Sequence, residues 1–460
     1  MTGVAEAALQ RDLTAAFGDE VVLPAVDRFY LEDATEARGL RGRADAVVTP
    51  RTADEVAELL AWCYERDVPV IPRGGGTGFA GGAVPLDGGV VVSLERLTRV
   101  RAFDPLLWRA HVEAGATTAA VRQLARENGL LFPPDPGAAE QSQIGGNIAT
   151  NAGGPHAFKY GVTRAWVSGL EVVVPPGRVL TVGGPLRKDV ATYDLCGLFV
   201  GSEGTLGIVT AAWLKLIPAP EAAFPVAAFY SDADAGCDAV ERVFGSGIKA
   251  AALEYLDAGT LDAARASFPA PVAEAARFLV VAEADGSRRE AEEVRGELLE
   301  ALGDGALSLH TPSDPADVAA LWRWRDGVSI SVTAQRGGKV SEDIVVPVDR
   351  LGEAVERTLD IGARHDLQAC SWGHAGDGNL HSTFLLSRED EAALERAEAA
   401  AAELFDAALA LDGSISGEHG LGYVKRQYLA RQCGVETLAL LAAIKHAFDP
   451  KGLLNPGKKL

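Results

Sequence analysis

The sequence predicts an α+β protein built from two domains, and three observations predict it. The chain has 460 residues, of which 48% are hydrophobic and 23% charged, a composition typical of globular proteins long enough for more than one core. Short apolar runs of strand length alternate with capped amphipathic helices. The composition also changes after Pro218-Ala-Pro220. We expect a helical N-terminal segment over 1–40, a first domain over 41–220 and a second over 221–460, whose C-terminal segment returns to the first.

The first domain begins with a helix that the residues Thr52-Ala-Asp-Glu55 predict by forming a capping box. A second helix is expected to begin near Thr117 and to end at Gly129, a residue type favoured just past a helix C-terminus. Between and before them lie short β-branched runs. The strands expected in this domain cover residues 68–71, 90–94 and 110–114.

The second domain shows a β-α-β-β-α order that recurs once. Helices are expected to follow Asp234, Ser287 and Asp349. This order predicts an antiparallel sheet with helices on one face. The strands expected here cover residues 226–230, 251–256, 278–284, 343–347, 369–372 and 380–385.

Charge and cysteine content exclude several classes of protein. The net charge of −21 argues against nucleic acid or an anionic membrane surface as the main partner. Five widely spaced cysteines without a CxxC pair exclude an iron–sulfur cluster and a cysteine-type zinc site, and favour a reducing, cytoplasmic location. We find no apolar run of about 20 residues and no signal-peptide pattern in residues 1–20.

Residues Gly76-Thr-Gly78-Phe-Ala-Gly81 match the G-x-G-x-x-G pattern of dinucleotide-binding folds. That fingerprint needs a helix that starts within the motif, so that the pyrophosphate meets the helix N-terminus. Here Pro85 and paired glycines follow, and the next expected element is a strand. We therefore expect no nicotinamide-binding fold.

Three glycine-rich loops in the first domain favour a diphosphate-bearing cofactor. They cover residues 73–81, 145–154 and 201–207. Consecutive backbone amides in such loops make concave anion sites, to which Arg73 would add charge-assisted hydrogen bonds. Ordinary turns are the alternative, but three dense loops in one domain are hard to explain by turn geometry alone.

Together with Pro133-Pro-Asp-Pro136, these loops make the chain similar to the FAD domain of the vanillyl-alcohol oxidase flavoprotein superfamily. Within it, the chain resembles the D-2-hydroxy-acid dehydrogenase branch, which includes D-lactate, glycolate and D-2-hydroxyglutarate dehydrogenases. The resemblance extends from about residue 40 to the end and implies a two-subdomain FAD-binding domain and a substrate (cap) domain. It implies non-covalent FAD, with His156 as an alternative attachment site. The residues it assigns to FAD are Pro72, Arg73, Gly74, Gly75, Gly76, Thr77, Gly78, Pro134, Asp135, Gly145, Gly146, Asn147, Thr150, Asn151, Gly153, Tyr160, Gly161, Glu203, Gly204, Gly207, Ile208, Val209 and Asn455.

In the second domain, His374-Ala-Gly-Asp-Gly-Asn-Leu-His381 places two imidazoles around a tight turn, and Glu418-His419 follows later. Two histidines and a carboxylate suit Zn²⁺, with Fe²⁺ and Mn²⁺ as alternatives. As a bare pattern, such histidines are more often solvent-facing or satisfied in a core. The resemblance assigns His374, His381 and Glu418 as metal ligands and His419 as general base; the alternative for His419 is a structural role.

Arg325 lies in an aromatic-rich helical segment and offers a planar guanidinium for a substrate carboxylate. The resemblance assigns it this role together with Ser329, although Arg323 is an alternative. Two positions depart from the hydroxyglutarate enzymes: Thr383 stands in place of Asn, and Ser341 in place of Lys, with Lys339 two residues earlier. Because the family residues serve the distal end of the substrate, specificity for hydroxyglutarate is in doubt.

The resemblance implies FAD-dependent oxidation of a D-2-hydroxy acid to the 2-oxo acid, assisted by the metal. The electrons would pass to an external acceptor: an electron-transfer flavoprotein, a quinone, a partner subunit or O₂. The alternatives are a flavin oxidase or transferase acting on another alcohol, a non-catalytic flavin subunit of a glycolate-oxidase-like complex, and a metal-dependent oxygenase or hydrolase with structural glycine loops. The oligomeric state stays open, with a homodimer as one alternative.

Overall fold

The structure is a computed structural model that describes residues 2–387, 389–390 and 392–460. Met1, the first residue of the expected N-terminal segment, lies outside the described residues. Two compact units make up the chain, and we describe each by itself. The first unit contains residues 1–153, 162–218 and 418–460, and the second contains residues 154–161 and 219–417. No helix in the described part of the chain has the length and low charge needed to cross a bilayer.

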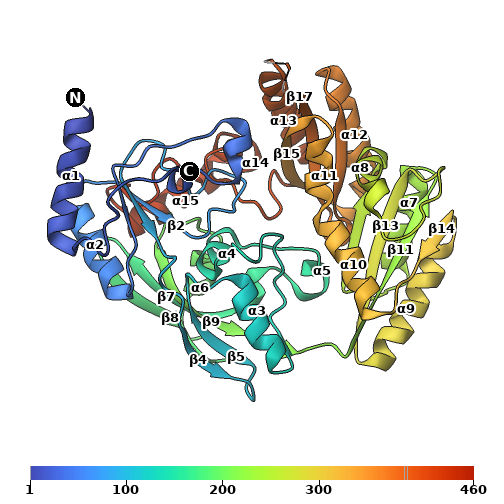
Figure 1. Cartoon of the computed structure of the whole chain (residues 1–460), viewed down its shortest axis with the longest axis horizontal. Coiled ribbons are helices and arrows are strands. Elements are labelled where there is room, and N and C mark those ends of the chain that lie inside the picture. Colours follow the sequence, from blue (N-terminus) through green and yellow to red (C-terminus); the bar gives the residue numbers. More distant parts are fainter. Residues whose placement is uncertain (1, 388, 391) are drawn as a thin grey trace. The chain divides into compact units, whose positions relative to one another are not determined.

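Unit 1 contains a parallel three-stranded sheet with the order β1-β3-β2 and an antiparallel five-stranded sheet with the order β4-β5-β9-β7-β8. A short pair, β10-β6, accompanies them. Figure 1 labels β2 of the parallel sheet and all five strands of the antiparallel sheet. The strands are β1 (Ala46–Val48), β2 (Val70–Arg73), β3 (Val90–Ser93), β4 (Val100–Asp104), β5 (Arg109–Glu113), β6 (Leu130–Leu131), β7 (Val167–Val174), β8 (Arg178–Gly183), β9 (Ile208–Lys215) and β10 (Ile217–Pro218).

The two predicted N-caps of unit 1 are confirmed, but the capping box at Thr52 is only half formed, because the Glu55 carboxylate accepts from Arg51 N–H at 2.6 Å. The Thr52 side chain accepts a hydrogen bond from Glu55 N–H, and that of Thr117 accepts one from Ala120 N–H, each at 3.1 Å. The helices of this unit are α1 (Thr2–Phe17), α2 (Ala53–Glu65), α3 (Thr118–Glu127), α4 (Ile144–Thr150), α6 (Leu195–Phe199), α14 (Leu429–Gln432) and α15 (Val435–Phe448), with 3-10 turns η1 (Arg28–Leu31), η2 (Ala34–Arg38), η3 (Thr163–Trp166) and η7 (Arg426–Tyr428).

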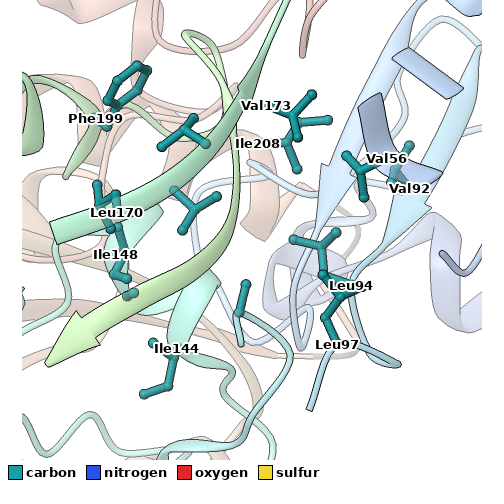
Figure 2. Packing of buried hydrophobic residues seen from close by; sticks show 14 of the residues in the cluster. Val56, Val92, Leu94, Leu97, Ile144, Ile148, Leu170, Val173, Phe199 and Ile208 are labelled. Atoms are coloured by element: carbon teal, nitrogen blue, oxygen red, sulfur yellow. The ribbon is translucent and has the colours of Figure 1, made fainter. Parts of the chain in front are cut away.

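One hydrophobic core joins the two larger sheets of unit 1, as Figure 2 shows. Val92 of β3 and Val173 of β7 belong to this core. The short helix α4 contributes Ile144 and Ile148, which are 1% and 0% exposed. The core therefore fixes α4, which carries the second glycine motif.

The glycine motifs of unit 1 meet our expectations in two places and depart from them in one. The chain from Gly74 to Gly89 forms no helix, which confirms that the G-x-G-x-x-G pattern is not a dinucleotide fingerprint. Residues 201–207 form a loop as expected. The expectation of a loop over 145–154 was wrong for its first part, because residues 144–150 are helical. The physical reason is that Ile144 and Ile148 pack into the core of unit 1, which outweighs the low helix propensity of the two glycines.

Unit 2 is built on a seven-stranded antiparallel sheet with the order β14-β11-β13-β12-β16-β17-β15. The strands are β11 (Ala222–Tyr230), β12 (Ala252–Leu256), β13 (Phe278–Gly286), β14 (Ser308–His310), β15 (Gly337–Val345), β16 (Ala369–His374) and β17 (Asn379–Ser387). The helices are α5 (Ala157–Tyr160), α7 (Ala233–Gly245), α8 (Ala258–Ala264), α9 (Arg288–Gly303), α10 (Pro315–Asp326), α11 (Val328–Ala334), α12 (Leu351–Arg364) and α13 (Ala393–Ala410), with 3-10 turns η4 (Arg265–Ser267), η5 (Val348–Arg350) and η6 (Ala375–Asp377).

Helices cover both faces of this sheet, so our expectation of helices on one face was wrong. Phe229 of β11 belongs to a core that includes Trp324 of α10 and Val328 of α11. The next residue, Tyr230, donates its hydroxyl to the Leu302 carbonyl of α9 at 2.6 Å. Successive strand residues point to opposite faces, so α9 lies opposite α10 and α11. The central strands are apolar at nearly every position and therefore bury both faces.

Candidate functional site

The three glycine motifs of unit 1 converge on α4. A Cβ on Gly74 would lie 3.3 Å from the Cα of Gly146, so the first loop contacts this helix directly. The third loop is tied to the other end of α4, because Gly201 N–H donates to the Ile148 carbonyl and Glu203 N–H to the Ala149 carbonyl, both at 2.8 Å. Segments more than 50 residues apart in sequence thus form one glycine-lined surface around α4.

This surface fits an extended diphosphate cofactor such as FAD. A Cβ on Gly78 or on Gly146 would meet no atom within 4 Å, so both glycines face open space. Nearby, Gln143 Oε1 and Asn455 Oδ1 are buried and accept no hydrogen bond in the structure. Buried acceptors without donors are rare in proteins, and a ligand that brings its own N–H and O–H groups would satisfy them.

Arg73 differs from our expectation of direct hydrogen bonds to an anion. Its guanidinium is buried, and Nη1 and Nη2 donate to the carbonyls of Glu32 and Phe29 at 2.7 and 2.6 Å. It lies directly behind the first loop, where a Cβ on Gly76 would come within 2.1 Å of Nη2. Arg73 therefore holds the N-terminal segment and supplies positive charge behind the loop.

Glu203 and Asn455 join the third loop to the C-terminal segment. The Glu203 carboxylate accepts hydrogen bonds from the backbone N–H groups of Leu421 and Gly422 at 3.0 and 2.6 Å, and it pairs with Lys459 at 3.0 Å. Asn455 Nδ2 donates to the Glu203 carbonyl at 2.8 Å. The side chain of Glu203 is therefore engaged within the protein.

The other expected cofactor residues of unit 1 have several structural roles. Asn147 is buried and donates Nδ2 to the Thr118 hydroxyl at 2.6 Å. A Cβ on Gly204 would lie 3.2 Å from Pro72 Cγ. Ile208 and Val209 are buried at the start of β9. The remaining members also lie in unit 1: Gly75, Thr77, Pro134, Asp135, Thr150, Asn151, Gly153 and Gly207.

Tyr160 and Gly161 lie instead with unit 2, in the segment 154–161. The Tyr160 hydroxyl donates to Asp285 Oδ2 at 2.5 Å, and Lys159 forms an ion pair with the same carboxylate. His156 is held in the same way: its Nε2 lies 2.9 Å from Glu283 Oε1. Two carboxylates of β13 thus anchor this segment to the sheet of unit 2.

The hairpin of β16 and β17 brings the two predicted histidine ligands together. Trp372 pairs with His381, and His374 pairs with Asn379, so both histidines lie on the same face of the sheet. Their ring centroids are 5.3 Å apart and nearly perpendicular. The hairpin needs a glycine before His374, because a Cβ on Gly373 would lie 2.3 Å from the Asn379 carbonyl oxygen.

Glu418 completes this group. It follows Gly417, whose N–H donates to Asp343 Oδ2 at 2.7 Å, and Asp343 is the cross-strand neighbour of His381 on β15. Ligand atoms of His374, His381 and Glu418 lie within 4.8 Å of one another. Two imidazoles and one carboxylate are a donor set of the kind that suits a borderline divalent metal.

Glu254 is a residue that the sequence reasoning missed. Its carboxylate is fully buried on β12; Oε1 lies 2.6 Å from His374 Nδ1, and Arg325 Nε donates to Oε2 at 2.8 Å. Burial alone would raise the pKa of Glu254, but the charges and hydrogen bonds of His374 and Arg325 outweigh it and hold the pKa to about 2. One signal was present: Glu254 is the only charged residue of the strand Ala252–Leu256.

The predicted substrate-binding residues lie on or above the same face of this sheet. Arg325 is buried, whereas the alternative, Arg323, is exposed. Lys339 Nζ donates to the Ser329 hydroxyl at 2.5 Å and lies over the Trp372 ring, and burial lowers the pKa of Lys339 to about 8. The fully buried Thr383 hydroxyl is 2.8 Å from that of Ser341.

The predicted base, His419, belongs to unit 1. Its ring centroid lies 4.7 Å from that of Phe79, which belongs to the first glycine loop. The chain passes from unit 2 to unit 1 between Gly417 and Glu418, so Glu418 and His419 are the first residues of the last segment of unit 1.

Comparison with known proteins agrees with this geometry. Residues 44–183 match the family model described as FAD binding domain, and residues 219–459 match the C-terminal domain of FAD linked oxidases. Over 93% of this chain and 91% of the relative, the chain is 39% identical to glycolate oxidase subunit GlcD of Bacillus subtilis. It is 32% identical to a D-lactate dehydrogenase of Anaerostipes hadrus, over 91% and 90% of the two chains.

The fold resembles that of solved structures of oxidative enzymes. With a TM-score of 0.79 and 18% identity, the chain superposes on p-cresol methylhydroxylase with substrate bound, covering 100% of this chain and 97% of the other. At this identity the likeness concerns the fold alone, and it agrees with the predicted α+β architecture of the vanillyl-alcohol oxidase type. The family matches together cover most of the sequence, and the chain therefore belongs to the FAD-linked oxidases.

Proposed function

We propose that this protein oxidises a D-2-hydroxy acid of the lactate, glycolate or 2-hydroxyglutarate class to the 2-oxo acid, with FAD and a divalent metal ion. The names of the relatives support the substrate class. The observation that carries the proposal is the His374, His381 and Glu418 group beside Arg325. Two imidazoles and one carboxylate leave coordination positions of a divalent metal open, and an α-hydroxy carboxylate could occupy them.

In this proposal the protein divides the work among separate groups. His374, His381 and Glu418 hold the metal, most fittingly Zn²⁺, which would polarise the α-hydroxyl group. Arg325 binds the substrate carboxylate by paired hydrogen bonds. His419 takes the hydroxyl proton. FAD, when bound at the glycine-lined surface of unit 1, would supply the acceptor for the hydride of the α-carbon.

Ser329, Lys339 and Thr383 are proposed to select the rest of the substrate. Lys339 and Ser329 contact each other, so a polar or anionic substituent would meet a joint amine and hydroxyl group. The Thr383 hydroxyl is already hydrogen-bonded to that of Ser341. We therefore propose that Thr383 limits the space for the substrate and does not donate to it.

FAD is proposed to bind without a covalent bond. The alternative attachment residue, His156, already places Nε2 against Glu283, and its ring lies 5.2 Å from that of Trp322. Attachment would require this nitrogen to leave a buried carboxylate partner.

We propose a partner subunit as the electron acceptor, with an electron-transfer flavoprotein or a quinone as alternatives. The relative with 39% identity is itself named as a subunit. We also propose a cytoplasmic location, because all five cysteines are free thiols, as expected in a reducing compartment.

The experiment is an absorption spectrum of the purified protein, followed by turnover with D- and L-lactate, glycolate and D-2-hydroxyglutarate and an artificial dye acceptor. We expect flavin bands and oxidation of D-enantiomers. A protein with bound flavin that oxidises none of these acids, with zinc present, would contradict the proposal and favour the non-catalytic flavin subunit.

A further inference from the structure

Glu254 occupies an unusual position in the second unit. It is fully buried on the central strand β12, and its two carboxylate oxygens hold two different side chains. One belongs to β16, 120 residues away in sequence, and the other to α10, 71 residues away. A buried charge is costly unless it is paired and hydrogen-bonded, so this residue type is not explained by core packing.

The contact with His374 determines which ring nitrogen is presented to the site. Glu254 Oε1 lies 2.6 Å from His374 Nδ1. A carboxylate accepts hydrogen bonds, so Nδ1 carries the proton and Nε2 is the nitrogen left to bind a metal. Metal-binding histidines commonly donate their other N–H to a carboxylate, which fixes the ring orientation.

The contact with Arg325 determines which edge of the guanidinium is presented. Nε and Nη2 both point to Glu254 Oε2, at 2.8 and 2.5 Å. These two nitrogens form the side-on edge of the guanidinium. The end-on edge, formed by Nη1 and the second N–H of Nη2, has no other hydrogen bond among the described residues and offers two parallel donors, the geometry that a carboxylate accepts.

We propose that Glu254 is a positioning residue that orients His374 for the metal and Arg325 for the substrate carboxylate at the same time. The inference rests on the proposed function, since it assigns Glu254 to that site. Because one carboxylate holds both groups, a change at Glu254 disturbs metal binding and substrate binding together. A purely structural ion pair would affect stability alone.

The test uses the full-length protein and two variants, Glu254→Gln and Glu254→Asp. The glutamine side chain keeps the size but has one acceptor oxygen, so either His374 or Arg325 meets an N–H group. The aspartate side chain keeps the charge but is one methylene shorter. We expect both variants to retain FAD. We expect zinc affinity, measured by competition with a chelator in the absence of substrate, to fall about 10- to 100-fold, and KM for the hydroxy acid at saturating zinc to rise about tenfold or more.

Glu403 provides a matched control. On the surface of unit 2, the Glu403 carboxylate contacts His365 Nε2 at 2.9 Å and Arg364 Nη2 at 2.6 Å. Like Glu254, it therefore joins one histidine and one arginine, but away from the site. Glu403→Gln should leave zinc affinity and KM as in the wild type.

The outcomes separate the two proposals. If the wild-type protein binds zinc and both Glu254 variants keep its zinc affinity and KM, this inference is overturned while the proposed function stands. If only the melting temperature falls, Glu254 is structural and the inference is equally overturned. A wild-type protein that binds no divalent metal would overturn both together. Should Glu254→Gln fail to fold, the Glu254→Asp variant, which keeps the buried negative charge, carries the same readouts.

Discussion

Gly146 of α4 is packed on one side and open on the other. Its Cα would lie 3.3 Å from a Cβ on Gly74, whereas a Cβ on Gly146 itself would meet nothing within 4 Å. Gly146 therefore has room for a side chain in the apoprotein, although the resemblance assigns this position to FAD. Folding and cofactor binding make opposite demands on this residue.

We predict that Gly146→Leu stabilises the apoprotein and weakens FAD binding. Leucine is favoured over glycine inside a helix by about 0.5–1 kcal/mol, and Gly146 lies inside α4. The same side chain would fill the open space that a cofactor needs. Flavin content of the purified protein and thermal unfolding after flavin removal measure the two effects.

Gly296 is the control for this prediction. It lies inside the surface helix α9, and a Cβ there would also meet no atom within 4 Å. Gly296→Leu should raise stability by a similar amount and leave the flavin content unchanged. Full flavin content in Gly146→Leu would show that FAD lies elsewhere.

Local sequence patterns predicted the parts of the site that local geometry determines. A few adjacent residues determine the N-caps at Thr52 and Thr117, and a few also determine the turn between His374 and His381. Glu254 stands out locally as the one charged residue of an apolar strand, but its role could not be predicted in this way, because its partners lie 71 and 120 positions away. The contact of Glu254 with His374 exists because β12 lies beside β16 in the sheet, and patterns in a single sequence do not encode strand order.

The same limit explains two other differences. Arg73 sits beside the first glycine loop in sequence, but its guanidinium is fixed by carbonyls of residues 29 and 32, which only the fold brings near. The helix α4 contains two glycines, which have low helix propensity, yet packing of Ile144 and Ile148 into the core of unit 1 overrides that preference.

We predict that removing metal abolishes turnover but not flavin binding. Dialysis against a strong chelator should lower kcat at least ~100-fold with unchanged flavin absorption, since the metal is expected to polarise the reacting hydroxyl, and added Zn²⁺ should restore activity. His381→Ala should behave like the chelated protein and should not be rescued, because it removes a donor from the group. Full activity of the metal-depleted protein would refute the role of this group.

His419→Ala is predicted to retain both FAD and zinc but to lose about 10²–10⁴-fold in kcat, the usual contribution of a general base. Its ring contacts Phe79 in unit 1, so the variant also loses a packing contact. Phe79→Leu is the control for that loss and should keep kcat within a few-fold. Equal losses in both variants would assign His419 a structural role.

The FAD of the wild-type protein is predicted to be released by acid precipitation, with no flavin fluorescence left on the denatured chain. His156 is engaged with Glu283 and lies against Trp322, so no attachment is expected. His156→Ala should therefore keep its flavin. Fluorescence that stays with the wild-type chain and is lost in this variant would identify covalent attachment.

Lys339→Met should stabilise the protein and weaken substrate binding. Burial lowers the pKa of Lys339 from 10.5 to about 8. The folded state therefore binds the proton less well than the unfolded state, and the cost is full below pH 8 and disappears as the pH rises toward 10.5. We expect the variant to be more stable by about 1–2 kcal/mol at pH 7, and this gain to shrink toward about pH 10.

Substrate binding should show the opposite trend with pH. Lys339 is cationic below pH 8 and contacts Ser329 and the Trp372 ring. If its charge attracts the anionic substrate, KM of the wild type rises as the pH passes about 8, and KM of Lys339→Met is high and flat. A wild-type KM that is flat from about pH 7 to 9, the range in which this amine would lose its proton, would remove Lys339 from the substrate site.

Lys458 is the control for both trends of Lys339. Burial lowers its pKa to about 8 as well, but it lies in unit 1, where it donates to the Val84 carbonyl. Lys458→Met should reproduce the trend in stability and keep the wild-type KM profile, because the burial cost of a lysine is general whereas the attraction of an anionic substrate depends on position. A KM profile that flattens equally in both lysine variants would trace the pH dependence to net charge and not to the site beside Ser329.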